Sequence, residues 1–387
     1  MIRQAAIALL AAAGMVQAAG WRATLLVSAD DPRLARDRIE AAYLGHPGGP
    51  AADGIAVALD EAKFELDAAG TSLAIDTVAV ADTAAARDAA TKAEKSGAVA
   101  LLADLPAAAL LAAVDATSAL PVLDIGQSSD RLREADCRAR MLHLLPSERM
   151  RADALAQALV ARKWRDVLLL AGPSTEDGER AATAKAAIQR YGLKLVAQRP
   201  FKRSADPRER ELANPLLLTA ATGGSYDAVW VVDADGEFAR SLPYRTGLPR
   251  PVVGDAGLFA LAWAPGFERF GAPQVARRFA RATRRPMTGH DWAAWLGAKA
   301  LVAAAIAQPK GPIAALREKV AQVELDGSKG VTLSFRPWDG QLRQPLLLAD
   351  GQGVIGLAPI DGILHPKNAL DTLGADEPEK RCKAGKR

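Results

Sequence analysis

Short apolar runs alternate with helical stretches along the first 255 residues of the chain. Runs such as DVLLLA at 166–171 and DAVWVV at 227–232 are nearly continuous in Val, Leu and Ala, which is typical of strands covered on both faces. Between these runs, Ala, Leu, Glu, Lys and Arg recur at helical spacing. The pattern predicts strands over 21–28, 72–81, 98–103, 121–125, 166–171, 193–198, 227–232 and 251–253, and helices over 53–69, 83–96, 106–117, 149–163 and 178–191.

This alternation predicts an α/β protein with two doubly wound parallel-sheet lobes, because strand–helix–strand units join parallel neighbours by right-handed crossovers. Each half of this region has four strand candidates, and the rhythm breaks near residues 144–147. After residue 255 the pattern predicts helices over 290–308 and 313–322 and strands over 331–335 and 345–348, which return the chain to both lobes. We therefore expect three crossover segments and a ligand cleft between the lobes. The predicted division is 19–145 with 258–335 for lobe 1, and 146–257 with 336–387 for lobe 2.

Residues 1–18 have the composition of a secretory signal peptide. Arg3 supplies the positive start, an apolar stretch of twelve residues follows, and Val16 and Ala18 are the small residues before a cleavage site predicted after Ala18. The apolar stretch is shorter than the roughly 20 residues that a membrane-spanning helix needs. We expect a protein exported to the periplasm without its signal peptide.

Export affects the interpretation of the two cysteines, Cys137 and Cys382. In an oxidising compartment two such thiols are more often paired than free, so a disulfide between them is predicted, with two unrelated thiols as the alternative. A bridge over this separation would stabilise the fold by roughly 4–5 kcal/mol on the chain-entropy model. The chain has no CxxC motif, which argues against a structural zinc site.

Charge and motifs exclude several functional classes. Lys and Arg number 49 against 45 Asp and Glu, and the two signs are mixed along the chain, which is unlike a nucleic-acid-binding protein. No G-x-S-x-G elbow, phosphate-binding loop, H-E-x-x-H or dinucleotide fingerprint is present, so neither an enzyme nor a bound cofactor is predicted. A secreted α/β hydrolase remains an alternative, because the members of a catalytic triad meet only in the folded protein.

Loops that follow the predicted strands carry the candidate ligand-binding residues, because a ligand between the lobes would lie at the carboxyl ends of the strands. Trp292, at the start of the long apolar helix, could also face the cleft. Three loop carboxylates within five residues would suit a hard cation, but carboxylates after a strand more often cap helices, so no metal site is predicted. The candidates in the loops are Asp30, Asp31, Ser128 and Ser129 in lobe 1, and Ser174, Asp233, Asp235 and Glu237 in lobe 2.

Several stretches carry a resemblance to a known family: 30–33 (DDPR), 242–245 with 248–254, 270–274 with 278–279, 334–345 (SFRPWDGQLRQP), 370–374 and 379–382. Together with the two-lobed rhythm, they resemble the type I periplasmic solute-binding proteins, in the branched-chain amino acid receptor group of ABC transporters. The stretches are similar to a subgroup associated with pyrroloquinoline-quinone (PQQ)-dependent alcohol oxidation.

The resemblance implies a non-catalytic protein whose two lobes close on a small solute and present it to an ABC permease in the inner membrane. In amino-acid-binding relatives, short residues of the first-lobe loops hold the ligand, whereas residues 104–107 here read DLPA. This loop argues against an amino-acid ligand. The resemblance to the subgroup implies a solute linked to alcohol oxidation: an alcohol- or acid-derived compound, the quinone, or a metal or metal complex. The alternatives are a periplasmic metal receptor and a docking protein that has lost its ligand.

Overall fold

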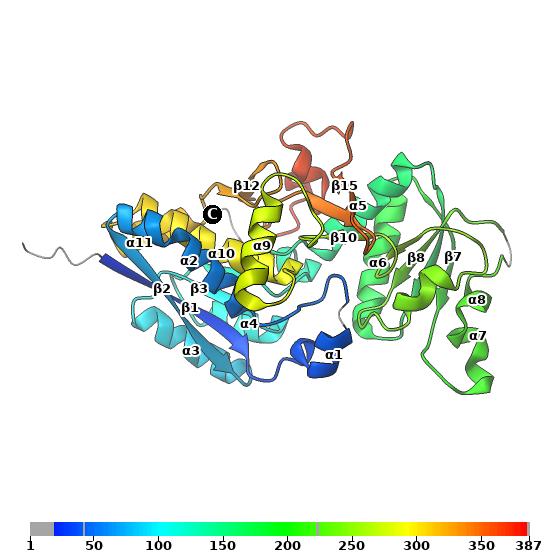
Figure 1. The fold of residues 1–387 in the computed structure, drawn as a ribbon, viewed down its shortest axis with the longest axis horizontal. Helices are drawn as coiled ribbons and strands as arrows, with labels where there is room; N and C mark the ends of the chain where they lie inside the picture. Colours follow the sequence, from blue (N-terminus) through cyan, green and yellow to red (C-terminus); the bar gives the residue numbers. More distant parts are fainter. Residues whose placement is uncertain (1–18, 42, 222–223, 385–387) are drawn as a thin grey trace, which may run out of the picture.

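The computed structural model describes residues 19–41, 43–221 and 224–384, and it has two α/β lobes (Figure 1). The predicted signal peptide lies outside the described residues. Each lobe contains a parallel sheet flanked by helices, as the alternation of apolar runs and helical stretches predicts. Within the described residues, no helix is long and apolar enough to cross a membrane.

The first lobe is built on a parallel sheet of strand order β2-β1-β3-β4-β5. Its last strand was not predicted, because its three residues follow the arginine-rich residues 138–140 and end in His143, so that no continuous apolar run marks them in the sequence. The strands are β1 (Ala19–Ser28), β2 (Thr71–Val80), β3 (Leu101–Asp104), β4 (Val122–Asp124) and β5 (Met141–His143), and the helices between them are α1 (Arg36–Ala41), α2 (Ala51–Ala68), α3 (Thr83–Lys95) and α4 (Ala107–Asp115).

The second lobe repeats this plan with a parallel sheet of order β7-β6-β8-β9. Strands β6 and β8 are almost completely buried, which explains their continuous apolar sequence. The elements are α5 (Glu148–Ala161), β6 (Asp166–Ala171), α6 (Thr175–Arg190), β7 (Lys194–Pro200), α7 (Arg210–Ala213), α8 (Pro215–Leu218), β8 (Ala228–Val232) and β9 (Val252–Gly254).

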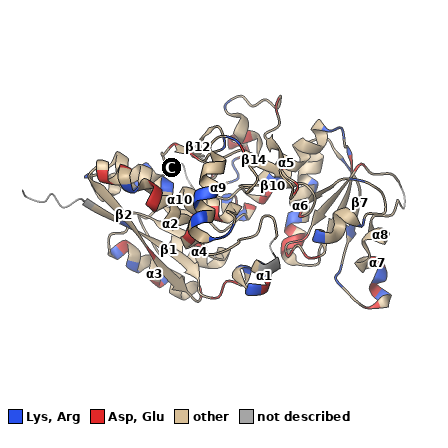
Figure 2. Ribbon diagram, in the orientation of Figure 1, with Lys and Arg blue, Asp and Glu red and all other residues tan. Residues whose placement is uncertain are grey.

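After β9 the chain returns to the first lobe and then crosses back. Helix α10 is buried almost all round and packs against α2, where a side chain at Gly54 would meet the Asp291 carbonyl oxygen at 2.4 Å. Helix α9 was not predicted; its exposed face carries arginines, while Val275 and Phe279 pack into the first lobe (Figure 2). The elements are β10 (Phe259–Leu261), α9 (Ala272–Thr283), α10 (Gly289–Ala307), α11 (Ile313–Val320), β11 (Leu325–Asp326), β12 (Thr332–Phe335), β13 (Leu342–Arg343), β14 (Leu346–Ala349) and β15 (Val354–Ala358).

A small antiparallel sheet of order β10-β14-β15 joins the two lobes. Its side chains alternate between two hydrophobic cores: Leu346 and Leu348 belong to the core of the second lobe, whereas Leu347 and Ala349 belong to that of the first. This alternation follows from the two-residue period of a strand. We call this three-stranded sheet the hinge sheet.

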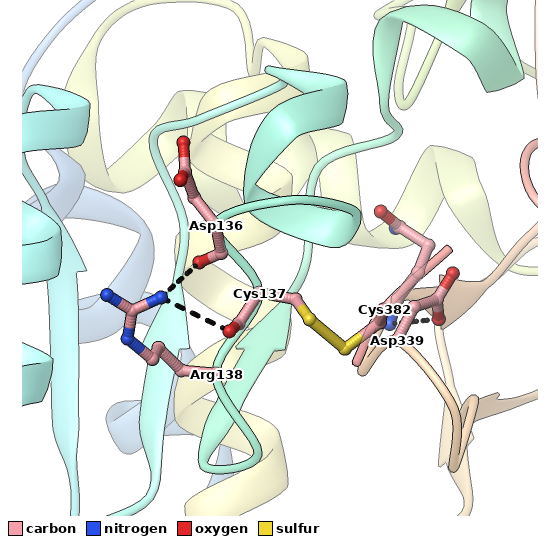
Figure 3. Close-up of a disulfide and its surroundings, with 6 residues drawn as sticks. Asp136, Cys137, Arg138, Asp339 and Cys382 are labelled. Atoms are coloured by element: carbon pink, nitrogen blue, oxygen red, sulfur yellow. Dashed lines mark hydrogen bonds between the residues drawn. A yellow bond between two sulfur atoms is a disulfide. The ribbon is translucent and has the colours of Figure 1, made fainter. Parts of the chain in front are cut away.

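The predicted disulfide between Cys137 and Cys382 is confirmed (Figure 3). Its Cα atoms are 5.7 Å apart, within the range that a disulfide requires. The bond joins the loop before β5 to the C-terminal tail.

The turn between β9 and β10 requires glycine at position 257. Gly257 has a φ of +68°, and a Cβ there would lie 2.1 Å from the carbonyl oxygen of Val252. We expect Gly257→Ala to lower the free energy of unfolding by roughly 1–3 kcal/mol, because it adds a steric clash to left-handed backbone strain. Urea denaturation of the purified protein would measure this loss.

Gly178 is the matched control, since it lies inside α6 with no atom within 4 Å of a built Cβ. Gly178→Ala should leave the protein as stable as the wild type or more stable by about 0.5–1 kcal/mol. Equal urea midpoints for the two alanine variants would contradict the requirement for glycine at 257.

Candidate functional site

A cleft of about 1360 Å³ lies between the two lobes. Its walls include the loops that follow the carboxyl ends of parallel strands, which is where a ligand was predicted to bind. The lining loop segments are 126–131 after β4, 173–174 with 176–177 after β6, 201–203 after β7 and 233–235 after β8.

The first-lobe wall contains a chain of charged side chains around Arg33. The Arg33 guanidinium donates to Asp31 Oδ2 and to Asp104 Oδ1, both at 2.6 Å. The other oxygen of Asp104 lies 2.8 Å from His290 Nε2. Burial raises the pKa of the Asp104 carboxyl, but His290 and Arg33 outweigh this effect and hold the pKa well below its usual range. Asp104 is therefore an ionised, fully paired group.

The tight packing of Asp104 explains the glycine opposite it. A Cβ at Gly126 would lie 2.4 Å from Asp104 Oδ1, so a larger residue would displace the carboxylate. His290 and Gly126 both line the cleft, whereas Asp104 is buried behind them. The aspartate in the DLPA loop thus positions the wall of the cleft instead of facing it.

Ser128 and Ser129 both line the cleft, beside the second lobe. The Ser128 hydroxyl accepts a hydrogen bond from Arg151 at 3.2 Å, and its carbonyl accepts one from the Glu148 N–H at 2.9 Å. The next residue, Asp130, accepts a hydrogen bond from the Thr183 hydroxyl on α6 at 3.2 Å. This loop therefore connects the two walls of the cleft.

The second-lobe wall has its own partly buried ion-pair network, centred on Arg180. Arg180 donates to Asp255 at 2.6 Å and to Glu148 at 3.1 Å. Burial raises the pKa of Glu148, but the neighbouring arginines outweigh it and lower the pKa. The arginines around which these networks are built thus lie against carboxylates on both walls, which offsets the cost of desolvating the charges.

Ser174 lines the cleft at the start of α6. It caps this helix in a reciprocal arrangement with Asp177: its hydroxyl accepts from the Asp177 N–H at 3.0 Å and donates to Asp177 Oδ2 at 2.6 Å. The other oxygen of Asp177 accepts from the Ala234 N–H at 2.7 Å, which ties the α6 cap to the loop after β8.

The three carboxylates after β8 act mainly in local structure. Asp233 accepts from the Ala239 N–H at 2.8 Å, and Asp235 accepts from the Glu237 N–H at 2.9 Å. Arg203 lies 2.7 Å from Glu237 and 3.7 Å from Asp235. The described residues contain no cluster of His, Cys, Asp or Glu that could hold a metal ion.

Four of the predicted residues do not line the cleft. Asp30 is exposed beyond the end of β1, Asp31 lies behind Arg33, and Glu237 pairs with Arg203. Trp292 is fully buried, where its indole N–H donates to the Gly327 carbonyl at 3.0 Å. The prediction that Trp292 faces the cleft disagrees with this position, since the ring packs into the core of the first lobe.

The sequence analysis missed several residues of the walls. Arg33 and His290 carried no catalytic or metal-binding motif, and Arg180 lies inside a helix with an ordinary amphipathic pattern. His46, between β1 and α2, also lines the cleft. Burial lowers the pKa of its imidazole; Arg180 of the second lobe acts in the same direction, and Asp255 opposes it. Of these residues, only Arg33 could have been identified from the sequence, because it directly follows the Asp-Asp-Pro residues of a predicted cleft loop.

A second bridge across the cleft comes from Tyr43. The Arg240 guanidinium lies 5.1 Å from the centre of the Tyr43 ring, and Gly236 faces the edge of the same ring. The segment between β1 and α2 thus reaches from the first lobe to the loop after β8.

Comparison with known proteins identifies the fold. No family model and no curated protein matches the chain. Among solved structures, it is similar to the branched-chain amino acid ABC transporter periplasmic ligand-binding protein of Burkholderia xenovorans, with a TM-score of 0.74, 14% identity and coverage of 94% of this chain and 99% of the other.

Two further structures agree. The leucine-, isoleucine-, valine-, threonine- and alanine-binding protein of Brucella ovis, in a closed conformation, matches with a TM-score of 0.69 and 13% identity over 95% of this chain and 99% of that one. An ABC transporter solute-binding protein of R. palustris, in complex with benzoate, matches with a TM-score of 0.64 and 14% identity over 88% and 96%. The chain thus has the fold of the type I periplasmic binding proteins.

The carboxyl of Asp233 makes the free energy of unfolding of the protein depend on pH. Burial, together with the nearby Asp235, Asp255 and Asp177, raises the pKa of Asp233 from its ordinary value of 3.8 to about 6. Between about pH 4 and pH 6 the unfolded chain releases this proton and the folded protein retains it, so the free energy of unfolding should fall as pH rises, by up to about 3 kcal/mol.

Urea denaturation of the wild type and of Asp233→Asn across this pH range would isolate the effect. The asparagine can still accept the Ala239 N–H hydrogen bond but does not titrate. We expect the stability of the wild type, relative to the variant, to decrease from about pH 4 to pH 6. A constant difference between the two proteins over this range would contradict the raised pKa.

Proposed function

We propose that the protein is the solute-binding component of an ABC transporter, which captures a small molecule between its lobes without catalysis. The observation that carries the proposal is the two-lobed cleft, with polar side chains from both walls, in a fold shared with periplasmic binding proteins. In this proposal the protein works in the periplasm after removal of the signal peptide, and its partner is an inner-membrane permease.

Closure of the lobes would follow from differential affinity. A solute that contacts both walls binds the closed state better than the open state, and this difference is the energy that drives closure. Ser128 and Ser129 on one wall, and Ser174, Asp233 and Asp235 on the other, are the proposed contacts from the predicted set.

The lining of the cleft favours a small organic solute with a polar end and an apolar body. Leu145, Phe201, Trp230 and Phe259 supply apolar surface beside the charged walls. The benzoate bound by the R. palustris protein is such a molecule, and leucine, bound by a solute-binding protein of Desulfitobacterium hafniense, is another. We propose that this chain binds a solute of this kind, including an alcohol- or acid-derived compound from PQQ-dependent alcohol oxidation.

A thermal-shift screen would test the proposal. The panel contains leucine, benzoate, short alcohols and their acids, the quinone cofactor, and divalent and trivalent cations. At a hundredfold excess over Kd, a ligand stabilises the folded state by about 2.7 kcal/mol, which raises the Tm by a few degrees. We expect such a rise with an organic solute. A rise with cations alone would favour the metal receptor, and no rise with any compound would favour the docking protein.

A substitution inside the cleft would locate the binding site. The Ser129 side chain lines the cleft, so Ser129→Phe should fill part of the space and abolish the thermal shift. Ser72→Phe is the matched control, because Ser72 is exposed on the edge strand β2. Isothermal titration with the solute identified in the screen should show binding for Ser72→Phe only; equal affinity in both variants would place the site elsewhere.

A further inference from the structure

The C-terminal tail, residues 359–384, is anchored on the second lobe. The Tyr191 hydroxyl donates to the Thr372 carbonyl at 3.0 Å, and Asp153 accepts from the Gly374 N–H at 2.8 Å. Leu373 is fully buried in the core of that lobe. Further along, Glu379 forms a two-point ion pair with Arg149 at the start of α5, at 2.5 and 2.8 Å.

The same tail is held by the β12–β13 hairpin, which packs on the first lobe through Phe335 and Leu342. Arg336, in the turn between β12 and β13, is completely buried and donates to the Leu370 and Leu373 carbonyls at 3.1 and 2.6 Å. Its guanidinium also pairs with Asp371 at 3.1 Å. The tail therefore runs past the boundary between the lobes, in contact with both.

The tail ends in the disulfide, whose other half belongs to the first lobe. Cys137 lies between the short 3-10 helix Asp130–Arg133 and β5 (Figure 3). The same connection, from β4 to β5, begins with residues 126–131, which line the cleft. Cys137 is thus only about six residues along the same connection from Arg131, which lines the cleft.

We propose that the Cys137–Cys382 disulfide is a clasp across the hinge: it bonds the tail, which is held on the second lobe by hydrogen bonds and an ion pair, covalently to the first lobe, and so limits the relative motion of the lobes. The main chain already crosses between the lobes three times, next to the hinge sheet. A tail bonded non-covalently to the second lobe and covalently to the first adds a restraint that these crossings do not supply. Any rotation of the lobes must either strain the tail or pull it off α5.

Interlobe distances measured by double electron–electron resonance would test the clasp. Spin labels attached through p-acetylphenylalanine at Lys95 on α3 and Lys185 on α6 place one probe on each lobe, both at exposed helical positions. This labelling chemistry leaves the cysteines untouched. The samples are the oxidised protein, the same protein reduced with a phosphine, and the double variant Cys137→Ser with Cys382→Ser.

We expect a narrow distance distribution for the oxidised protein and a broader one for both the reduced protein and the double variant. Amide hydrogen exchange in β1 and β6 should remain unchanged, which shows that both lobes stay folded. If the double variant fails to fold, the reduced wild type still decides the question.

Lys367→Gln is the matched control, because it breaks an exposed ion pair within the tail, with Glu377, but keeps both the disulfide and the Glu379–Arg149 ion pair. Its distance distribution should stay as narrow as that of the oxidised wild type. If the distributions of oxidised and reduced protein superimpose, while only the amide exchange of the tail increases, the disulfide merely anchors the tail and the proposal is overturned.

Discussion

The hinge sheet is the constraint on which the rest of the structure depends. Strands β10 and β14 send alternate side chains into the two hydrophobic cores, so that Leu346 and Leu347 are neighbours in sequence but belong to different lobes. Neither lobe can be completed without this sheet, since each core lacks part of its surface in its absence. The lobes are therefore fixed to each other at one edge, and the cleft opens away from it.

The charged walls of the cleft follow from the same architecture. Two lobes that face each other across a cleft must place their strand-end loops, and the polar residues of these loops, in a partly dehydrated space. Arg33 and Arg180 satisfy this condition because each lies between two carboxylates. Paired charges of this kind leave the hydroxyls, Asp233 and Asp235, the His290 ring and the apolar side chains as the groups proposed to meet a solute.

The sequence predicted the elements of the fold well where they are long. Strands β1 and β6 and helices α3 and α10 lie within two residues of their predicted bounds, because continuous apolar runs and helical periodicity report burial directly. Two elements were not predicted. Strand β5 is a short segment that ends in a histidine, and helix α9 has a single buried stripe among its arginines. Among the candidate residues, the serines after β4 and β6 line the cleft, whereas Asp30 after β1 and Glu237 after β8 do not, because position in a loop after a parallel strand does not fix where a side chain points.

The sequence by itself determined the two-lobed α/β fold and the loops that face the cleft, and it predicted the pairing of the cysteines, which the structure bears out. These properties depend on local pattern and composition. Only the tertiary structure decided that Trp292 packs in the core, that Asp104 is held between Arg33 and His290, and that the tail spans both lobes. Such contacts join residues far apart in the chain, and no periodicity in a single sequence records which distant side chains meet.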